Sequence, residues 1–428
     1  MDTVFALSSG QLPAAVGVMR ISGPMAGPVL HQLCTRIPPA RHAALRRLHD
    51  PRDGAELDRA LVLWFPGPAS ATGEDCVELH LHGGRAVADA VAGTLTALGL
   101  RMAEPGEFTR RAFANGRLDL AEVEGLADLL AAETELQRRS AQAMAGGVLS
   151  RAADAWRTEV LALSARLEAS LDFADEGDVD EAVLPAGFAD GCGELADAIG
   201  QWLDRPRAEP LREGFRVVLA GPPNAGKSTL FNALIESDAA IISAEPGTTR
   251  DVLVAAVALG GVPFSFVDTA GLRDEGAGTI EALGIARARA AAERADLVLW
   301  LGPQGQGPTD RPLWEIAAQS DRGDGAAKDA NAYRVSAMTG DGVAQLRQAL
   351  ICAARNAMPA PGQAALNQRQ ARCLYAVHQA LVSATQESDP LLAAECLRLA
   401  RRGLDGLVGR ADTEAMLDAL FGRFCIGK

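Results

Sequence analysis

The chemistry that this sequence predicts most clearly is phosphate binding by residues 221–228, which read GPPNAGKS. The pattern GxxxxGK followed by Ser or Thr comes after an apolar run typical of a buried strand and before a helical run. In that context, backbone N–H groups of the loop and of the helix N-terminus converge on phosphate oxygens. We expect Lys227 to neutralise the β- and γ-phosphates and Ser228 to bind Mg²⁺. The residues of this segment predicted to contact a nucleotide are Asn224, Ala225, Gly226, Lys227, Ser228 and Thr229.

Three more short segments follow in the order that a GTPase needs. Residues 247–251 (GTTRD) offer the Thr249 hydroxyl to Mg²⁺ and the γ-phosphate, in a loop that can order or relax. Asp268 ends an apolar run close to the expected metal, and the Gly271 N–H is then expected at the γ-phosphate. Residues 336–337 (Ser-Ala) follow a short predicted strand, where GTPases hold the guanine O6. The further nucleotide contacts predicted are Gly247, Thr248, Thr249, Asp268, Thr269, Ala270, Gly271, Ser336 and Ala337.

The loop that reads the base is incomplete. GTPases usually have Asn-Lys-x-Asp here, and the best match is residues 318–321, Ala-Gln-Ser-Asp. Asp321 can accept hydrogen bonds from the N1 and N2 edge of guanine, which adenine does not offer. Because the Asn and the Lys are absent, we expect weaker nucleotide affinity and weaker guanine selectivity. Two alternatives stay open: Asp321 is only a loop carboxylate while the base binds elsewhere, or the enzyme is an ATPase.

The residue that orients the attacking water is also unusual. Small GTPases have a Gln directly after the glycine of their DxxG motif, but here Leu272 follows Gly271. A leucine side chain cannot hydrogen-bond water, so hydrolysis needs another device.

Alternating strands and helices must position these residues. The pattern predicts buried parallel strands at 215–220 and 296–301, and a short strand at 332–335. Residues 252–259 and 262–267, separated by two glycines, are predicted to form a hairpin. The expected sheet therefore places the phosphate loop directly after its first strand.

The whole chain divides by pattern into four segments. Residues 1–117 are predicted to be mixed α/β, residues 118–210 helical, residues 211–358 alternating strands and helices, and residues 359–428 helical again. We therefore expect a multidomain fold, α/β plus α, in which the 211–358 domain is inserted into a discontinuous helical domain. The length of 428 residues agrees, since a domain takes about 150 residues.

The composition excludes several other classes of protein. Hydrophobic residues make up 48% of the chain and charged residues 22%, which is globular rather than disordered. A net charge of −14 does not attract a polyanion in bulk, so contact with nucleic acid must be local or made by a partner. The seven cysteines include no CxxC, which argues against a zinc site or a disulfide scaffold. With no apolar run of membrane length and no secretory signal, we expect a cytoplasmic protein.

Motifs outside the phosphate loop extend the argument to essentially the whole chain. Together with that loop, they resemble the tRNA modification GTPase family MnmE (TrmE). A phosphate loop alone indicates only an NTPase, whereas a terminal CIGK behind it is far more specific. The segments that carry the resemblance are 20–23 (RISG), 63–68 (LWFPGP), 72–75 (TGED), 82–84 (HGG), 105–113 (PGEFTRRAF), 115–120 (NGRLDL) and 424–428 (FCIGK).

The resemblance implies an N-terminal α/β domain that dimerises and binds a 5-formyl-tetrahydrofolate type of folate, a discontinuous helical domain and an inserted Ras-like G domain. It also implies that a homodimer works with an FAD-dependent partner, MnmG. Together they would install a carboxymethylaminomethyl or aminomethyl-type group at C5 of the wobble uridine of certain tRNAs. Direct contact of tRNA with this chain, rather than mainly with the partner, stays open. The alternative function is a switch or ribosome-assembly GTPase without tRNA chemistry.

For the G domain, the resemblance implies dimerisation across the active sites with K⁺ bound. Asn224 matches the family's K⁺ ligand, and the loop 243–248 would cover the ion. Glu281 matches the catalytic Glu that acts as general base or orients water, and a solvated residue at a helix start is the alternative. The residues matched to metal ligands are Asn224, Ser228, Ser243, Glu245, Thr248 and Thr249.

For the N-terminal domain and the tail, the resemblance implies a folate site at Arg20, Glu78, Arg117 and Lys428. Arg117 stands where many relatives have Lys, which keeps the charge but changes the donor geometry. Glu78 lies in an alternating strand, and the alternative is that it simply faces solvent. Cys425 is the candidate for addition to C6 of uracil, which activates C5, and a small apolar residue is its alternative. We expect the last few residues to be free to enter a neighbouring pocket, so that residues 425–428 reach the folate site of the N-terminal domain and serve modification rather than hydrolysis.

Overall fold

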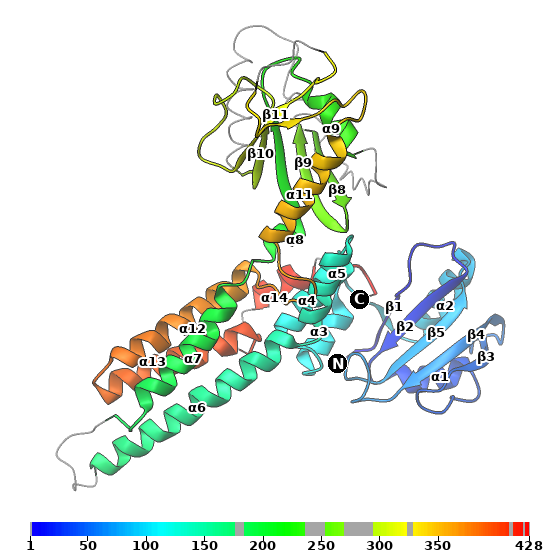
Figure 1. Ribbon diagram of the computed structural model, residues 1–428. Coiled ribbons are helices and arrows are strands. Elements are labelled where there is room, and N and C mark those ends of the chain that lie inside the picture. The colour runs from blue at the N-terminus through cyan, green and yellow to red at the C-terminus, as the bar shows by residue number, and fades with distance from the viewer. Residues whose placement is uncertain are drawn as a thin grey trace, which may run out of the picture. The chain divides into compact units, whose positions relative to one another are not determined.

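The computed structural model divides into two compact units (Figure 1). The first contains residues 1–127 and 404–428, and the second contains residues 128–403. No helix in the described part of the chain is both long and apolar enough to cross a bilayer. The residues that the structure describes are 2–175, 184–235, 253–268, 294–322, 328–410, 414–422 and 424–427.

The first unit is built on a six-stranded sheet with the order β3-β4-β5-β2-β1-β6. Its neighbouring strands are antiparallel, except that β1 and β6 are parallel. The strands are β1 (Val4–Leu7), β2 (Val16–Ser22), β3 (Ala44–His49), β4 (Glu56–Phe65), β5 (Cys76–His82) and β6 (Arg101–Met102). The helices in this part of the chain are α1 (Ala26–Leu33), α2 (Arg85–Ala97), α3 (Glu107–Ala114), α4 (Leu120–Leu130) and α14 (Glu414–Phe421).

The core of this unit lies between one face of the sheet and the helices α1 and α2. Strand β5 shows the pattern, because Val77, Leu79 and Leu81 are buried in that core. Glu78 and His80 alternate with them, lie on the opposite face and are half-buried. This is the alternation that a strand covered on one side requires. The expected α/β fold of the N-terminal segment is confirmed.

In the second unit, helices from before and after the nucleotide-binding part of the sequence pack together. Helix α7 (Phe188–Leu203) lies along α12 (Gln368–Gln386), as Figure 1 shows. Trp202 of α7 meets Trp156 edge to face, with ring centroids 5.9 Å apart. The helical domain is therefore discontinuous in sequence, as predicted. The remaining described helices are α5 (Glu135–Ala145), α6 (Val148–Asp175), α8 (Glu209–Glu213), α9 (Lys227–Ile235), α11 (Val343–Ala357) and α13 (Pro390–Leu407).

The second sheet has the order β12-β11-β10-β7-β9-β8. Strands β8 and β9 form the predicted antiparallel hairpin, and the other neighbours are parallel. Because the carboxyl ends of parallel strands share one edge, the loops after β7, β9, β11 and β12 gather there. The strands are β7 (Phe215–Ala220), β8 (Leu253–Leu259), β9 (Val262–Asp268), β10 (Leu297–Trp300), β11 (Leu313–Ala317) and β12 (Tyr333–Arg334).

Strand β11 is the element of this sheet that the sequence did not predict. Of its five residues, only Ile316 is fully buried, and Glu315 interrupts the apolar run. The preceding connection, residues 301–312, contains no helix. The usual alternation of strand and helix is therefore missing at this point, which removes the signal on which the prediction depended.

Candidate functional site

The phosphate loop runs from the end of β7 at Ala220 to the start of α9 at Lys227. Within it, Gly221, Asn224 and Gly226 have positive φ angles of 151°, 60° and 88°. Residues with a side chain rarely adopt such angles, and Gly and Asn do so most readily. The sequence thus has Gly or Asn at each position of this loop where the φ angle is positive.

Lys227 lies inside the loop rather than in solvent. It is 7% exposed, and its Nζ donates hydrogen bonds to the carbonyl oxygens of Gly221 at 2.9 Å and Pro222 at 2.8 Å. A buried ammonium needs such polar partners. The positive charge is therefore held within the loop that would enclose the phosphates, where it suits the role of neutralising their oxygens.

Ser228 and Asp268 connect the phosphate loop to the end of β9. Ser228 Oγ donates a hydrogen bond of 2.7 Å to Asp268 Oδ2. Asp268 is fully buried and Ser228 is exposed. A hydroxyl and a carboxylate beside phosphate oxygens are the hard ligands that Mg²⁺ prefers, so these residues fit that ion. Elsewhere in the described part of the chain, no group of three or more His, Cys, Asp or Glu is arranged to hold a metal.

Residues of the predicted base loop line a small pocket beside the phosphate loop. Buried Ser336 donates a hydrogen bond of 2.7 Å from Oγ to Asp321 Oδ1. This bond holds the pKa of the Asp321 carboxyl below its usual range, so the carboxylate accepts hydrogen bonds at neutral pH. The pocket has a volume of about 100 Å³, and its lining includes Gly226, Thr229, Gln319, Asp321, Ala337 and Met338.

Gln319 joins the base loop to the phosphate loop, which the sequence did not predict. Its Nε2 donates a hydrogen bond of 3.2 Å to the backbone oxygen of Asn224. Both residues have left-handed backbones, with φ angles of 57° and 60°. The local pattern shows only that the usual lysine is missing at 319. It contains no signal for the contact that glutamine makes instead.

Several residues predicted to act at this site lie outside the described residues. They include the loop proposed to cover K⁺, part of the DxxG motif and the candidate catalytic Glu; the terminal Lys, which was matched to the folate site, also lies outside the described residues. These residues are Ser243, Glu245, Gly247, Thr248, Thr249, Thr269, Ala270, Gly271, Glu281 and Lys428.

Two of the residues matched to the folate site face each other on neighbouring strands. Arg20 and Glu78 are register partners in β2 and β5, and Arg20 Nη2 lies 2.8 Å from Glu78 Oε1. His80 Nε2 is 3.4 Å from the other Glu78 oxygen, and the Arg20 guanidinium lies 5.7 Å from the centre of the Phe108 ring. Glu78 is therefore half-buried and held by Arg20 rather than simply facing solvent.

Arg117, also matched to that site, is exposed and lies beside Gly73. A Cβ added at Gly73 would lie 3.2 Å from Arg117 Cγ. Among the described residues, the Arg117 side chain forms no hydrogen bond or ion pair with Arg20 or Glu78. The structure thus brings two of the four matched residues into contact.

The C-terminal tail, residues 424–427, lies on the N-terminal domain within the first unit. It forms an antiparallel β-bridge with Pro105, and Ser8 Oγ donates a hydrogen bond of 2.8 Å to the Gly427 oxygen. Cys425 is exposed between these contacts. The tail therefore reaches the N-terminal domain, as expected, and its described part is docked there.

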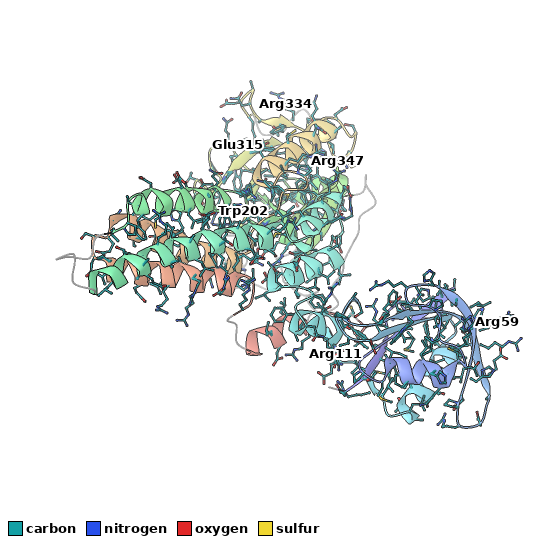
Figure 2. All side chains as sticks on the ribbon, turned by 90° about the horizontal axis from the view of Figure 1, so that it is seen from below. Arg59, Arg111, Trp202, Glu315, Arg334 and Arg347 are labelled. Carbon is teal, nitrogen blue, oxygen red and sulfur yellow. The ribbon has the colours of Figure 1, made fainter. Side chains whose placement is uncertain are left out.

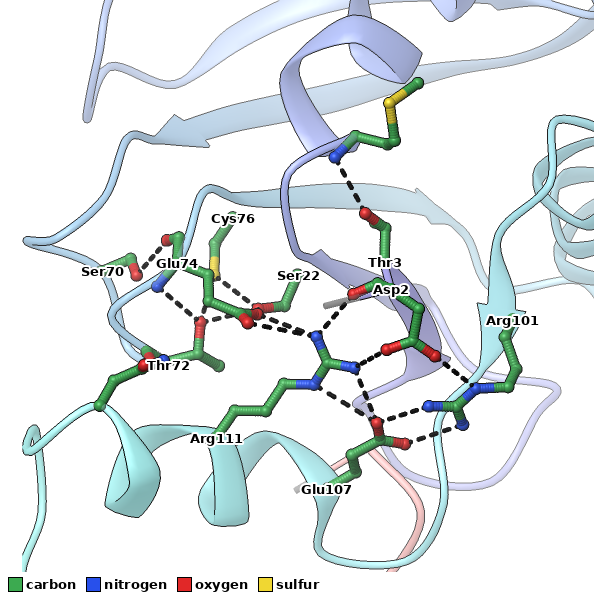
Figure 3. A network of polar contacts seen from close by, with 12 residues as sticks. Asp2, Thr3, Ser22, Ser70, Thr72, Glu74, Cys76, Arg101, Glu107 and Arg111 are labelled. Carbon is green, nitrogen blue, oxygen red and sulfur yellow. Dashed lines mark hydrogen bonds and ion pairs between the residues drawn. The ribbon is translucent and has the colours of Figure 1, made fainter.

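Arg111 organises a charged network that the sequence analysis missed (Figure 3). Its Nη2 donates hydrogen bonds of 2.8 Å to both Asp2 Oδ1 and Glu107 Oε1, and its Nη1 lies 3.1 Å from Glu74 Oε2. Burial by itself raises the pKa of Glu107, but the guanidiniums of Arg101 and Arg111 outweigh it and lower that pKa. Glu107 precedes Arg111 by one turn of α3, but Asp2 and Glu74 come from distant segments, so no local pattern signals the whole network.

The fold and the site together define a class of protein. A phosphate loop after β7, a buried aspartate at the end of β9 and a small pocket lined by the loops after β11 and β12 form the arrangement of a P-loop GTPase. Residues 3–117 match the family described as GTP-binding protein TrmE N-terminus, and residues 120–425 match the MnmE helical domain. The chain belongs to the MnmE (TrmE) family of tRNA modification GTPases.

Individual relatives agree over the full length. The tRNA modification GTPase MnmE of Novosphingobium aromaticivorans is 67% identical over 435 residues, and the protein of the same name from Erythrobacter litoralis is 60% identical over 429 residues. Both alignments cover 100% of each chain. Among solved structures, Era from Aquifex aeolicus bound to GDP and AlF₄⁻ is 21% identical with a TM-score of 0.26, over 41% of this chain and 69% of that chain.

Proposed function

We propose that this chain is a cytoplasmic, K⁺-dependent GTP hydrolase that acts as a homodimer with the FAD-dependent MnmG subunit. The pair adds a carboxymethylaminomethyl or aminomethyl-type group to C5 of the wobble uridine of certain tRNAs, using the one-carbon unit of a 5-formyl-tetrahydrofolate type of folate. The observation that supports this most is that the residues matched to GTP hydrolysis and those matched to tRNA modification lie in different units. Ser228 and Asp268 meet in the second unit, whereas Arg20, Glu78 and the docked tail lie in the first.

Nucleotide binding follows from the charges of the second unit. Lys227 and the N–H groups at the start of α9 would hold the phosphates, and Asp321 would accept from the guanine edge. Ser228, oriented by Asp268, and Thr249 would hold Mg²⁺. That ion offsets the charge of the β- and γ-phosphates during transfer to water. Because Asp321 acts without the usual Asn and Lys, selectivity rests on a single carboxylate.

Hydrolysis needs a substitute for the missing Gln, since Leu272 follows Gly271. Asn224 is a K⁺ ligand in this proposal, and its exposed position within the phosphate loop is compatible with that role. A cation there would replace an arginine finger, because both offset charge on the transferred group. Ser243, Glu245 and Thr248 would complete its coordination. Glu281 would orient or deprotonate the attacking water.

The folate proposal rests on residue types and on one contact. A pteridine ring needs a carboxylate to accept from its amino and ring N–H groups, and Glu78 is fixed by Arg20 for such a task. The glutamate tail of folate needs cations, which Arg117 and Lys428 would supply. Arg20, Glu78 and the exposed Arg117 fit these roles by chemistry.

Cys425 is the proposed nucleophile toward tRNA. Its exposed thiol, as thiolate, would add to C6 of uracil, so that C5 attacks the one-carbon unit and the folate nitrogen that carried it leaves as an amine. Conversion of the transferred formyl group to an aminomethyl-type group would then need an amine, which forms an imine with loss of water, and two electrons from the reduced FAD of the partner. Loss of the C5 proton and release of the thiolate would then restore the ring. All seven cysteines are free thiols, which suits a reducing compartment.

The test compares hydrolysis of GTP and ATP in KCl and in NaCl at equal ionic strength, and then follows wobble-uridine modification with MnmG and folate. We expect faster hydrolysis of GTP, stimulation by K⁺, and modification that Cys425→Ser abolishes. Equal rates in both salts would contradict the K⁺ proposal. Modification at the parent rate by Cys425→Ser would contradict the role of the thiol, and a preference for ATP would establish the ATPase alternative.

A further inference from the structure

The described end of the chain is held on both sides of Cys425. On one side, Phe424 is 5% exposed and packs against Phe421, with ring centroids 6.3 Å apart. On the other side, Ile426 pairs with Pro105 through an antiparallel β-bridge. The backbone of Cys425 is therefore fixed at two neighbouring points while its side chain remains exposed.

The tightest of these contacts is made by Gly427. It is buried, its φ angle is 98°, and a Cβ at this position would lie 2.3 Å from the backbone oxygen of Leu7. Its own carbonyl oxygen accepts the 2.8 Å hydrogen bond from Ser8 Oγ. A residue with a side chain does not fit here without moving the backbone of β1, so the site requires glycine.

We propose that Ser8 and Gly427 form a latch that holds the tail on the N-terminal domain, and that tRNA modification requires this latch whereas GTP hydrolysis does not. Both are positioning residues, since they act by fixing the backbone course through Cys425 and toward Lys428. An untethered tail of several residues would sample many positions, and the thiol would meet a uracil ring less often in a reactive geometry. The functional half of this inference rests on the proposed role of the tail.

The first test replaces glycine in the full-length protein. Gly427→Ala forces both a left-handed alanine and a close contact, so we expect hydrogen exchange of residues 424–427 to become at least about tenfold faster. Gly406→Ala is the matched control, because a Cβ there meets nothing within 4 Å. We expect exchange in the tail, modification and GTP hydrolysis to be unchanged by the control.

The second test uses the other half of the latch. Ser8→Ala removes one hydrogen bond, so we expect about a fivefold gain in tail exchange and a similar loss in the modification rate. Ser8→Thr keeps the hydroxyl, and we expect it to restore both. In Ser8→Ala, we expect the K⁺-stimulated GTPase activity and the melting temperature to stay unchanged. If Ser8 only stabilised the fold, its loss would lower the melting temperature as well as the modification rate.

The outcomes separate the latch from the proposed function. Tail exchange that is unchanged in Gly427→Ala would overturn the latch itself. Faster exchange with modification at the parent rate would overturn its functional role. The Cys425→Ser variant keeps the latch intact, so loss of its modification activity alone reports on the thiol and not on Ser8 or Gly427.

Discussion

Ser228 and Asp268 lie 40 positions apart in the sequence, yet Ser228 Oγ is 2.7 Å from Asp268 Oδ2. The serine lies in the first turn of α9 and the aspartate ends β9, so this hydrogen bond ties the phosphate loop to the next strand of the sheet. The bond orients the hydroxyl, and it satisfies a carboxylate that would otherwise be costly to bury. The two oxygens therefore lie side by side next to the phosphate loop.

Replacement of Asp268 by Asn keeps the volume and removes the charge, so we expect the Mg²⁺ affinity to fall by about 10- to 100-fold. The Mg²⁺ concentration that gives half-maximal GTP hydrolysis reports this directly. Asp296→Asn is a suitable control, since Asp296 accepts from the Arg216 N–H just before β10, away from the phosphate loop. An unchanged Mg²⁺ requirement in Asp268→Asn would remove Asp268 from the metal site.

Replacement of Asp321 by Asn tests the incomplete base loop. We expect GTP binding to weaken by about tenfold or more, because a charge-assisted hydrogen bond is lost. Binding of xanthosine triphosphate should improve, since xanthine presents an acceptor where guanine has an amino donor. Titrations with both nucleotides measure this change of preference from GTP to xanthosine triphosphate. If it does not occur, residues 318–321 are not the base loop.

Glu281→Ala tests the substitute for the missing Gln. The variant should bind a fluorescent GTP analogue as the parent does and should hydrolyse GTP at least ~10²-fold more slowly, the low end for a general acid or base. Glu275→Ala, in the same segment, should have little effect on the rate. A Glu281→Ala protein with parental turnover would make Glu281 an ordinary solvated residue.

Arg111→Ala should lower the stability of the first unit by about 3 kcal/mol, because it leaves the nearly buried Glu74 and Glu107 without their shared partner. Arg111→Lys should recover only part of this, since an ammonium lacks the guanidinium fork. Arg139→Ala, at a pair that is half exposed, should cost less than ~1 kcal/mol. Denaturant unfolding of the three variants gives these differences.

The same network predicts a pH dependence. The pKa of Glu107 is lowered in the folded protein, so its contribution is fully present above the pKa of the unfolded chain, about 4.3, and is lost as the pH falls through the folded value. The parent should therefore lose stability in acid more steeply than Arg111→Ala. Equal acid slopes would contradict the interpretation of Figure 3.

The sequence predicted those features whose residues are close together in the chain. The phosphate loop is one segment, so its Gly, Lys and Ser define its geometry, and the alternation of Val77, Leu79 and Leu81 indicates which face of β5 is covered. The Ser228 and Asp268 contact was implied, because parallel strands place their carboxyl ends together.

Contacts between distant segments could not be predicted in this way. Arg111 belongs to a motif that marked the family, yet its partner Asp2 lies 109 positions away. Ser8 and Gly427 are separated by 419 positions, and neither residue type indicates a contact. Figure 2 shows the labelled Arg111 among the side chains of the first unit. Such contacts depend on tertiary packing, which periodicity and spacing do not encode.

If this chain contains two separable sets of functional residues, deletion of residues 425–428 should affect one activity and leave the other. GTP hydrolysis in KCl and wobble-uridine modification with MnmG and folate are measured on the same preparation. We predict that hydrolysis stays within about twofold of the parent while modification is abolished, since the tail makes its described contacts only in the first unit. Full modification by the truncated protein would contradict the claim, as would a collapse of GTP hydrolysis.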